Sequence, residues 1–239
     1  MHEIHLSLID STNTYAKIHA ETFPQNQITC ITAEEQSAGR GRYQRTWLSP
    51  RGANIYATFY FTLPLNTAHL ISLAQVMASS FANVLINEGF SPKIKWPNDI
   101  QVNGKKISGI LCETQFCKDH VDLFLGIGIN VNLDEQTALK IDQPATSLLI
   151  ETGKNWDKKE LLKKLQVQFE KDLETFKEDG FSPFHKQFES LLAKKGETIR
   201  CFDGKKMWEG ICHSLTAEGQ LNILLSDQTI HTITSGDIK

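Results

Sequence analysis

The sequence predicts an α+β fold, in which a mostly antiparallel, mixed β-sheet with flanking helices precedes a small C-terminal β-barrel. Helical and strand-like segments follow one another over the first 194 residues without the regular alternation of a βαβ protein. From about Gly196, turn dipeptides such as Asp203-Gly204 and Glu218-Gly219 separate four or five short strand-like runs. We therefore predict two domains, one over residues 1–194 and one over residues 195–239.

Four segments carry helix signals. Ser11 is the expected N-cap of the first, and Asp157 with Glu160 forms the pattern of a capping box before the third. The second repeats apolar residues at helical spacing and is followed by Gly89, a typical helix stop. The expected helices cover residues 12–21, 68–88, 158–176 and 183–194.

Strand signals lie between these helices. The segment 53–62 is rich in aromatic and β-branched residues, which favour strands. Asn103-Gly104 predicts a type I′ turn between two strands, because both residues accept positive φ angles. The other expected strands cover residues 28–32, 99–102, 109–116 and 121–131.

Composition excludes several classes of protein. The net charge is −3, whereas dedicated nucleic-acid-binding proteins carry a basic excess, so we expect no DNA partner. The five cysteines form no CxxC pair, which indicates free thiols in a reducing compartment. The N-terminus lacks a signal-peptide pattern and no apolar run of transmembrane length is expected, so we predict a cytoplasmic protein without a membrane partner.

A basic, glycine-containing loop is the first candidate site. Arg40, Arg42, Arg45 and Arg51 fall in a stretch with no acidic residue, and Gly39 and Gly41 flank the first arginine. Arginine forks bind phosphate or carboxylate oxygens in pairs, and glycines let the backbone approach a ligand. The loop therefore indicates an anion site, with a solvated basic loop as the alternative.

Two lysine-containing motifs follow. In Lys95-Trp-Pro-Asn98-Asp99, a lysine can bind phosphate and Asp99 can hold Mg²⁺, while the alternative is a proline turn with Trp96 in the core. In Lys105-Lys106-Ile-Ser-Gly109, a lysine at the start of a strand can meet an anion, while the alternative is an exposed, charged sheet edge.

A neutral polar cluster completes the set. Ser11, Thr12 and Asn13, together with Gln36, offer hydroxyl and amide groups suited to an uncharged, hydrogen-bonding ring such as a ureido group. The alternative role of the first three is the helix cap. The run Gly126-Ile-Gly-Ile-Asn130 lacks the third glycine and the following helix of a dinucleotide fold, so we do not assign it one.

Taken together, these motifs resemble the biotin protein ligases. The resemblance covers about residues 11–149 and includes Gly126-Ile-Gly-Ile-Asn-Val-Asn and Ala145-Thr-Ser-Leu. It implies a biotin/lipoate-ligase-like catalytic domain over residues 1–194 and an SH3-like barrel over residues 195–239. Gln44 stands where many members have glycine, and residues before Ser11 leave no room for the DNA-binding domain of some members, so we expect no repressor function.

The resemblance also implies roles for individual residues, with Lys106, Arg40, Arg42 and Asp99 as the catalytic set. It implies biotin and biotinoyl-AMP contacts at Ser11, Thr12, Asn13, Gln36, Gly39, Arg40, Gly41, Arg42, Lys106 and Gly109. It implies ATP contacts at Arg42, Trp47, Lys95, Asn98, Asp99 and Asn130. Asp99 is the expected metal ligand, and its alternative role is a base in the transfer step.

The implied activity is that of a biotin–[acetyl-CoA-carboxylase] ligase. Such an enzyme uses ATP and Mg²⁺ to form biotinoyl-5′-AMP and transfers biotin to a lysine of a biotin carboxyl carrier protein. The alternatives are a lipoate or octanoate ligase of the same fold and a non-catalytic module that binds biotin or its adenylate. Homologous folds occur as monomers and dimers, so a homodimer is one expected state.

Overall fold

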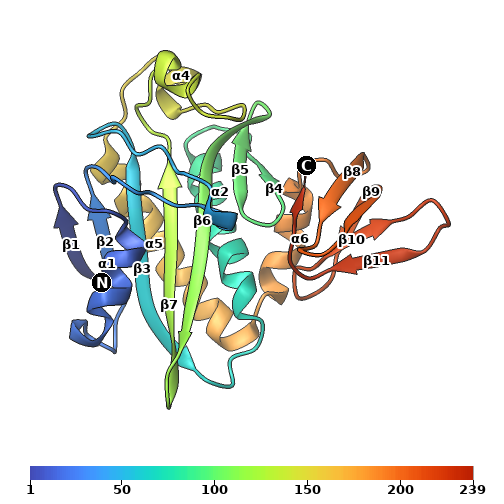
Figure 1. The fold of residues 1–239 in the computed structure, drawn as a ribbon, viewed down its shortest axis with the longest axis horizontal. Helices are drawn as coiled ribbons and strands as arrows, with labels where there is room; N and C mark the ends of the chain where they lie inside the picture. Colours follow the sequence, from blue (N-terminus) through green and yellow to red (C-terminus); the bar gives the residue numbers. More distant parts are fainter. Residues whose placement is uncertain (239) are drawn as a thin grey trace. The chain divides into compact units, whose positions relative to one another are not determined.

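The protein is described by a computed structural model that covers residues 1–238, so Lys239, the last residue of the predicted barrel, lies outside the described residues. The chain divides into two compact units, each assembled from separate segments (Figure 1). The first unit holds residues 1–67 and 104–164, and the second holds residues 68–103 and those from 165 onward. The predicted division between residues 194 and 195 stays a prediction.

A mixed, mostly antiparallel sheet forms the first unit, as predicted. Its strands are hydrogen-bonded in the order β1-β2-β3-β7-β6, and Figure 1 shows β6 and β7 as a long hairpin. Only β1 and β2 run parallel, while the other neighbours are antiparallel. The strands are β1 (His2–Leu6), β2 (Thr29–Ala33), β3 (Ile55–Pro64), β6 (Lys105–Phe116) and β7 (His120–Ile129).

Helix α1 (Thr12–His19) packs on β2, β3 and β7. It ends earlier than the predicted residue 21, and a 3₁₀ turn, η1 (Ala20–Thr22), continues the chain. Tilted aromatic rings pack at this end: the Tyr60 ring lies 5.3 Å from that of Phe23 and 5.5 Å from that of Phe124, measured between centroids. The buried cluster beneath the helix is Ala16, Ala20, Phe23, Ile31, Tyr60 and Phe124.

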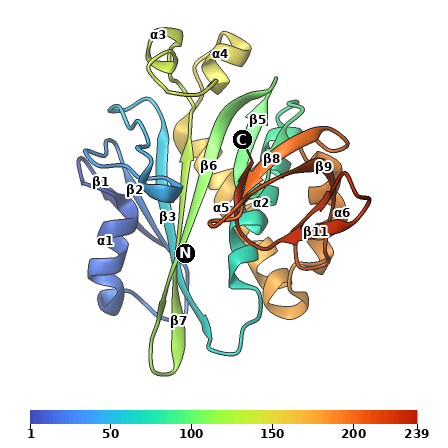
Figure 2. The same ribbon diagram turned by 45° about the vertical axis from the view of Figure 1, so that its right-hand side comes forward.

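Short helices that the sequence did not predict follow β7. They are α3 (Glu135–Ala138) and α4 (Leu148–Thr152), drawn close together in Figure 2. Side chains cap both: Asp134 accepts the amide of Thr137, and Ser147 accepts the amide of Ile150. Four or five residues give too little periodicity to be recognised, so only the caps could have signalled them.

The second unit begins with helical segments whose positions agree with the prediction. The turn η3 (Leu70–Ser72) leads into α2 (Leu73–Asn87), and Gly89 follows with a φ of +88°. Helix α5 (Lys158–Asp179) continues from the first unit into the second, and α6 (Ser182–Leu191) packs on α2. The hairpin strands β4 (Lys93–Lys95) and β5 (Asp99–Val102) pair with each other, and Asn103 and Gly104 then take the positive φ angles expected of a type I′ turn.

The expectation that no apolar run reaches transmembrane length was wrong. The segment Leu70–Asn87 is 18 residues long and apolar enough to cross a membrane by length and composition. In the structure, 67% of this segment is buried inside the protein, and α2 packs against α6, β4 and β5. It is therefore a core helix, and its apolar character comes from burial on several sides.

Between residues 195 and 238 the structure describes five strands, within the predicted range. They form an antiparallel sheet in the order β11-β10-β9-β8-β12. The strands β11 and β12 are the edges of this order, so closure into an SH3-like barrel stays a prediction. Their bounds are β8 (Thr198–Phe202), β9 (Met207–Leu215), β10 (Leu221–Leu224), β11 (Ile230–Ile233) and β12 (Asp237–Ile238).

The Asp157 cap of α5 gives a first testable prediction. Its carboxylate accepts the backbone amides of Lys159 (2.8 Å) and Glu160 (3.1 Å), two donors that the helix itself cannot satisfy. Asp157→Ala should therefore lower the free energy of unfolding by about 1 kcal/mol in chemical denaturation. Asp179→Ala at the other end of the helix is the matched control and should be neutral or slightly stabilising, because a carboxylate opposes the dipole there. Equal losses in the two variants would contradict the capping role.

Candidate active site

The first turn of α1 is buried in the first unit. Ser11, Thr12 and Asn13 are each at most 5% exposed. Ser11 occupies the N-cap position with extended backbone angles, as predicted, but its hydroxyl makes no capping hydrogen bond. Instead its own amide donates to Asp10 Oδ1 at 2.6 Å. The Ser11 hydroxyl is therefore not committed to the helix.

Gln36 lies against this turn, as the sequence predicted. Its Oε1 accepts from the backbone amide of Thr12 at 2.9 Å and lies 3.3 Å from the Thr12 hydroxyl. Its Nε2 donates to Ser49 Oγ at 3.0 Å. The Thr58 hydroxyl on β3 lies 2.8 Å from Thr12 Oγ1. These contacts hold Gln36 and Thr12 in one rigid, uncharged group.

Asn13 joins the helix to the middle of the sheet. Its Oδ1 lies 2.6 Å from the Thr58 hydroxyl, and its Nδ2 donates to Glu113 Oε2 at 2.9 Å and lies 3.4 Å from Phe124 O. A Cβ added at Gly126 would lie 2.4 Å from Asn13 Oδ1. The glycine on β7 therefore makes the space that the Asn13 amide occupies.

Glu113 and Lys17 belong to this cluster, although the sequence interpretation missed both. Lys17 Nζ lies 2.6 Å from Glu113 Oε1. Burial opposes ionisation of Glu113, but hydrogen bonds from Lys17 and Asn13 outweigh it and hold the pKa of this carboxyl below its usual value. The available signal was the spacing of Asn13 and Lys17, four residues apart and so on one face of α1.

Backbone hydrogen bonds close the basic loop. The Trp47 amide donates to Gly39 O at 2.9 Å, and the Gly41 amide donates to Arg45 O at 2.7 Å. A Cβ added at Gly39 would lie 2.6 Å from both Ser49 Oγ and Trp47 O. Close packing therefore requires glycine at position 39, in addition to the expected approach of the backbone to a ligand.

The tip of this loop is left-handed. Tyr43 and Gln44 have φ angles of 55° and 60° in the turn η2 (Arg42–Gln44). Residues with side chains rarely adopt such angles, and glycine does so without cost. Glycine, the residue that the resemblance implies at the position of Gln44, would adopt this angle without strain.

Arg40 contacts helix α1, whereas Arg42 and Arg45 both lie near the Tyr43 ring. Arg40 is exposed and donates to Thr14 Oγ1 on α1 at 2.7 Å. Arg42 is half-buried, with its guanidinium carbon 5.1 Å from the centre of the Tyr43 ring. The Arg45 guanidinium lies 6.0 Å from the same ring. The aromatic ring thus spaces two of the cations at the loop tip.

Trp47 fills a slot above two facing glycines. Gly109 on β6 is paired in register with Gly128 on β7. A Cβ added at Gly128 would lie 2.3 Å from Trp47 Cε2, and one at Gly109 would lie 3.1 Å from Trp47 Cζ3 and 3.0 Å from Lys106 Cε. The Lys106 ammonium lies 5.3 Å from the indole centre. The sequence interpretation assigned Gly109 to the site but missed Gly128.

The indole nitrogen of Trp47 is unusual. It is buried and has no hydrogen-bond partner within the part of the chain that the structure describes. A buried N–H without a partner costs on the order of 1–3 kcal/mol, so such groups are rare and call for a reason. An indole held beside Lys106 with an unused donor is suited to move or to receive an acceptor when a ligand enters.

Asn130 is engaged within the protein. Its Nδ2 donates to Thr146 O at 3.0 Å, and its Oδ1 lies 3.4 Å from Asn54 Nδ2. It is 3% exposed. These contacts tie the end of β7 to the segment before α4, so its predicted nucleotide contact stays a prediction.

The Lys-Trp-Pro-Asn-Asp motif lies in the second unit. Lys95 and Asp99 are half-buried and are paired in register across the β4–β5 hairpin, and Asn98 is buried. Trp96 is 2% exposed and donates its indole N–H to Gly219 O at 3.0 Å. The alternative interpretation of the motif, with Trp96 in the core, is confirmed. The polar residues on either side of Trp96 lie in the hairpin.

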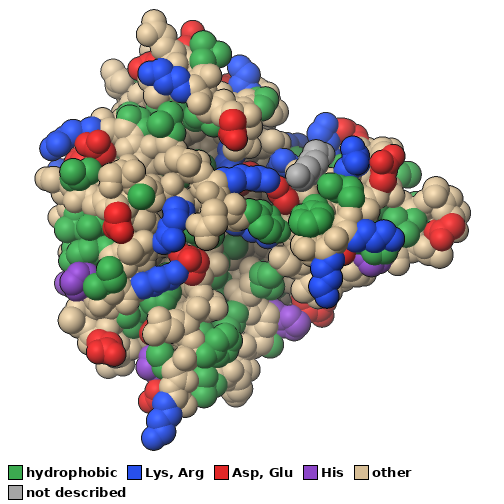
Figure 3. All heavy atoms as spheres, viewed as in Figure 1, with side chains coloured by type: hydrophobic (Ala, Val, Ile, Leu, Met, Phe, Trp, Pro, Cys, Tyr) green, Lys and Arg blue, Asp and Glu red, His purple; other side chains and the backbone are tan. Residues whose placement is uncertain are grey.

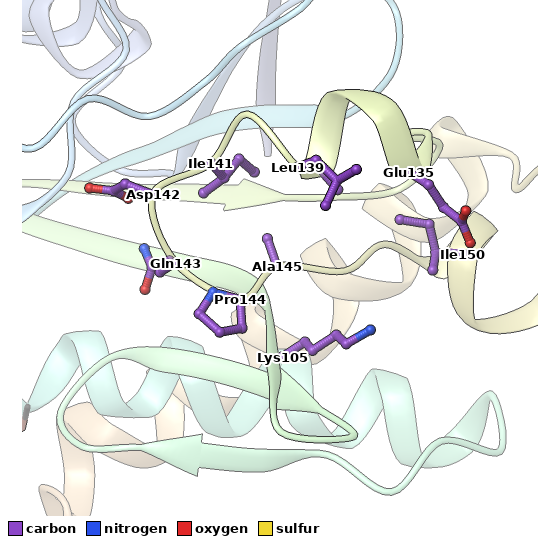
Figure 4. Close-up of a pocket in the computed structure, with 10 residues that line it drawn as sticks. Lys105, Glu135, Leu139, Ile141, Asp142, Gln143, Pro144, Ala145 and Ile150 are labelled. Carbon is purple, nitrogen blue, oxygen red and sulfur yellow. The ribbon is translucent and has the colours of Figure 1, made fainter.

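A cavity of about 460 Å³ lies next to the start of β6 (Figure 4). It borders Lys105, the neighbour of Lys106, and the described residues around it include none of the predicted site residues. The segment on its rim is joined to Lys106, whose amide donates to Pro144 O at 2.9 Å and whose carbonyl accepts from Thr146 N at 2.9 Å. The lining comprises Lys105, Glu135, Ala138, Leu139, Ile141, Asp142, Gln143, Pro144, Ala145 and Ile150.

Comparison with known proteins gives these features a context. The profile of the biotin/lipoate A/B protein ligase family matches residues 6–130. The bifunctional ligase/repressor BirA of Escherichia coli is 32% identical over 98% of this chain and 72% of its own length. The biotin–[acetyl-CoA-carboxylase] ligase of Paracoccus denitrificans is 30% identical over 90% of this chain and 91% of its own.

A solved structure agrees. The biotin protein ligase of Aquifex aeolicus in complex with biotin and ATP superposes with a TM-score of 0.82 at 32% identity, covering 100% of this chain and 97% of that one. The chain belongs to the biotin/lipoate A/B protein ligase family. Every predicted site residue, from Ser11 to Asn130, falls within the segment that the family profile matches.

The slot beneath Trp47 gives a prediction about this ligase-family site. Gly128→Ala should lower the free energy of unfolding by about 1–3 kcal/mol, because the added methyl group overlaps the indole. In a Trp47→Ala background the same change should cost much less, since the overlapping atoms are gone. Gly41→Ala is the control, because its added Cβ would come no closer than 3.7 Å to Arg45 O. Equal costs of Gly128→Ala in both backgrounds would show that the indole does not occupy the slot.

Proposed function

We propose that this chain is a biotin–protein ligase, which uses ATP to form biotinoyl-5′-AMP and then transfers biotin to a lysine of a biotin carboxyl carrier protein. The observation that carries the proposal is the neutral polar cluster of Thr12, Asn13 and Gln36, held beside a loop of arginines. The relatives and the solved structure named above support it through their stated activity and ligands.

The cluster favours biotin over lipoate or octanoate. The ureido group of biotin has one carbonyl acceptor and two N–H donors, all uncharged. Ser11, Thr12, Asn13 and Gln36 offer matching hydroxyl and amide groups that are buried or half-buried. Thr12, Asn13 and Gln36 already have partners within the protein, but an alkyl chain or a dithiolane ring would leave the buried Ser11 hydroxyl without one, at a cost of roughly 1–3 kcal/mol.

In the proposed first step, a carboxylate oxygen of biotin attacks the α-phosphate of ATP and pyrophosphate leaves. Negative charge gathers around the phosphorus, so cations positioned in advance lower the barrier. We assign this role to Lys106, Arg40 and Arg42. Gly39, Gly41 and Gly109 bring the backbone of the loop and of β6 close to the acyl-adenylate.

We assign nucleotide contacts to Lys95, Asn98 and Asp99 in the second unit, and to Trp47 and Asn130 in the first. Lysine suits a phosphate, and an indole suits an adenine ring. The donor chemistry also fits Mg²⁺, since this ion typically takes one or two protein carboxylates together with substrate phosphates, and Asp99 presents a half-buried carboxylate. When bound there, Mg²⁺ would neutralise phosphate charge.

In the proposed second step, the amine of the carrier lysine attacks the acyl carbon of the adenylate, forming an amide and releasing AMP. The lysine must first lose its proton, because its ordinary pKa is about 10.4. Asp99 as the base in this step is the alternative to its role as a metal ligand.

We place the enzyme in the cytoplasm, without DNA or membrane as a partner. All five cysteines are free thiols, as expected in a reducing compartment. On the face drawn in Figure 3, the described Lys and Arg side chains are interspersed with Asp and Glu and form no continuous basic field. A homodimer is one assembly that we propose for the enzyme.

Lys106→Ala tests the proposed chemistry most directly. It should reduce biotin-dependent exchange of pyrophosphate into ATP, and biotin transfer to a purified carrier domain, by at least about a hundredfold, because a cation at the transferring phosphate is lost. Lys105→Ala removes the same charge from the neighbouring, exposed position and should leave both rates within about twofold of the parent.

Near-normal exchange by the Lys106→Ala protein would refute the role of this lysine. Binding of biotin by the unaltered protein, without exchange or transfer, would instead favour the non-catalytic module.

The loop should become protected when its ligand binds. The Gly39–Arg45 segment contains an exposed, left-handed tip, and contacts from Arg40 and Arg42 to the acyl-adenylate would order it. We expect biotin with ATP to slow trypsin cleavage after Arg42 and Arg45 severalfold, measured by mass spectrometry of the fragments. Cleavage in the exposed turn at Lys205 is the internal control and should not change. Unchanged cleavage of the loop would contradict closure.

A further inference from the structure

The turn that joins β6 to β7 brings three side chains of different chemistry together. One sulfur, nitrogen or oxygen atom from each of Cys117, His120 and Asp122 lies within 4.8 Å of the other two. Cys117 Sγ is 3.3 Å from Asp122 Oδ2, and His120 Nε2 is 3.3 Å from Asp122 Oδ1. The backbone fixes this arrangement, because the Cys117 amide donates to His120 O at 2.9 Å.

These separations match those of ligands around one metal ion. With Zn–N and Zn–O bonds of about 2.0–2.1 Å and Zn–S bonds of about 2.3 Å, tetrahedral geometry places neighbouring ligand atoms roughly 3.3–3.5 Å apart. The two contacts at 3.3 Å lie at the lower end of that range, and each involves a different oxygen of Asp122. The three ligand atoms lie within 4.8 Å of one another, so a small cation would be bound after the side chains shift toward it.

The surroundings orient the ligands. His120 Nδ1 lies 2.7 Å from Asp119 Oδ1, so the ring can donate from Nδ1 and present Nε2 to a metal. A carboxylate behind a histidine is a common support of zinc ligands. Asp122 Oδ1 also accepts from the Tyr60 hydroxyl at 2.8 Å, and Gln25 Nε2 lies 3.3 Å from that hydroxyl.

The buried Asp122 carboxylate requires a positively charged partner. It is 4% exposed, and no Lys or Arg within residues 1–238 forms an ion pair with it. A buried carboxylate is costly unless it is paired or coordinates a metal. His120 in its protonated form is one such partner, and a divalent ion is the other.

We propose that Cys117, His120 and Asp122 form a binding site for one borderline transition-metal ion, such as Zn²⁺ or Co²⁺. Sulfur, nitrogen and oxygen ligands together select this class over Mg²⁺ or Ca²⁺. On binding, the Cys117 thiol loses its proton to solvent and its sulfur bonds the metal, with water in the fourth position.

The site is separate from the predicted ligase chemistry. The glycine pair Gly109–Gly128 lies near one end of the β6–β7 hairpin, and the pair Phe116–Val121 lies at the other, seven register steps away. At about 3.3 Å for each step, the separation is about 23 Å. Figure 1 shows the turn as the yellow-green tip at the foot of the hairpin. The metal would therefore stabilise the turn and take no part in adenylation.

Titration with Co²⁺ tests the proposal. The chelator-treated, full-length protein should bind one Co²⁺ per chain, with a thiolate-to-cobalt charge-transfer band and the strong visible bands of a tetrahedral ion. Cys117→Ser should abolish the charge-transfer band, and His120→Gln and Asp122→Asn should each weaken binding severalfold. Asp119→Asn should keep the band but weaken binding by about tenfold, as expected of a supporting residue.

Matched controls distinguish a site formed by all three side chains from binding of the metal ion by a single cysteine. Cys112→Ser, on strand β6 before the turn, should keep the band, and Cys117→Ser should keep full biotin transfer. Zn²⁺ should raise the melting temperature of the parent protein but not that of Cys117→Ser. A missing band in folded parent protein would overturn the proposal, as would a band that persists unchanged in Cys117→Ser or in both His120→Gln and Asp122→Asn.

Discussion

The geometry of the predicted ligand site depends on the Asn13 side chain and its contact with the sheet. This amide, buried in the first turn of α1, reaches Thr58 on β3 and Glu113 on β6, and it occupies the space left by Gly126 on β7. One side chain thus fixes the helix against three strands. Because Thr12 shares the same turn and binds Gln36, the uncharged hydrogen-bonding groups next to it are fixed as well.

Charged side chains lie around the neutral cluster of Thr12, Asn13 and Gln36. Glu113 is the acid of the cluster, and Lys17 and Asn13 satisfy it, so it need not bind a ligand cation. The Arg40 guanidinium donates to the Thr14 hydroxyl on α1, and the Lys106 ammonium lies beside the Trp47 ring. A hydroxyl partner does not neutralise a guanidinium, so the hydrogen bond to Thr14 leaves Arg40 its attraction for an incoming anion.

Much of this could be predicted from the sequence. Periodicity located α2, caps located α1 and α5, and the Asn103-Gly104 turn required no tertiary information. The motif resemblance grouped Thr12 with Gln36 and Lys106 with Gly109, and the structure brings each pair together. Each of these signals is local or is carried by a motif, so one sequence suffices to read it.

Other features could not be predicted, because they depend on register. The role of Gly128 exists only because β7 places it opposite Gly109 beneath Trp47. Glu113 meets Lys17 only after α1 has packed on the sheet. The short edge strand β1 alternates exposed and half-buried residues and includes two histidines and a glutamate, so its composition gave no strand signal. In the same way, Cys117 and Asp122 converge only because the hairpin turns between them.

The central claim is that a buried, uncharged hydrogen-bonding group selects a ureido acid for activation by ATP. The most direct test is exchange of labelled pyrophosphate into ATP by the purified protein with biotin, lipoate or octanoate as the only acid. The account predicts exchange with biotin and, at equal concentration, none above background with the other two. Exchange supported by lipoate or octanoate but not by biotin would contradict it.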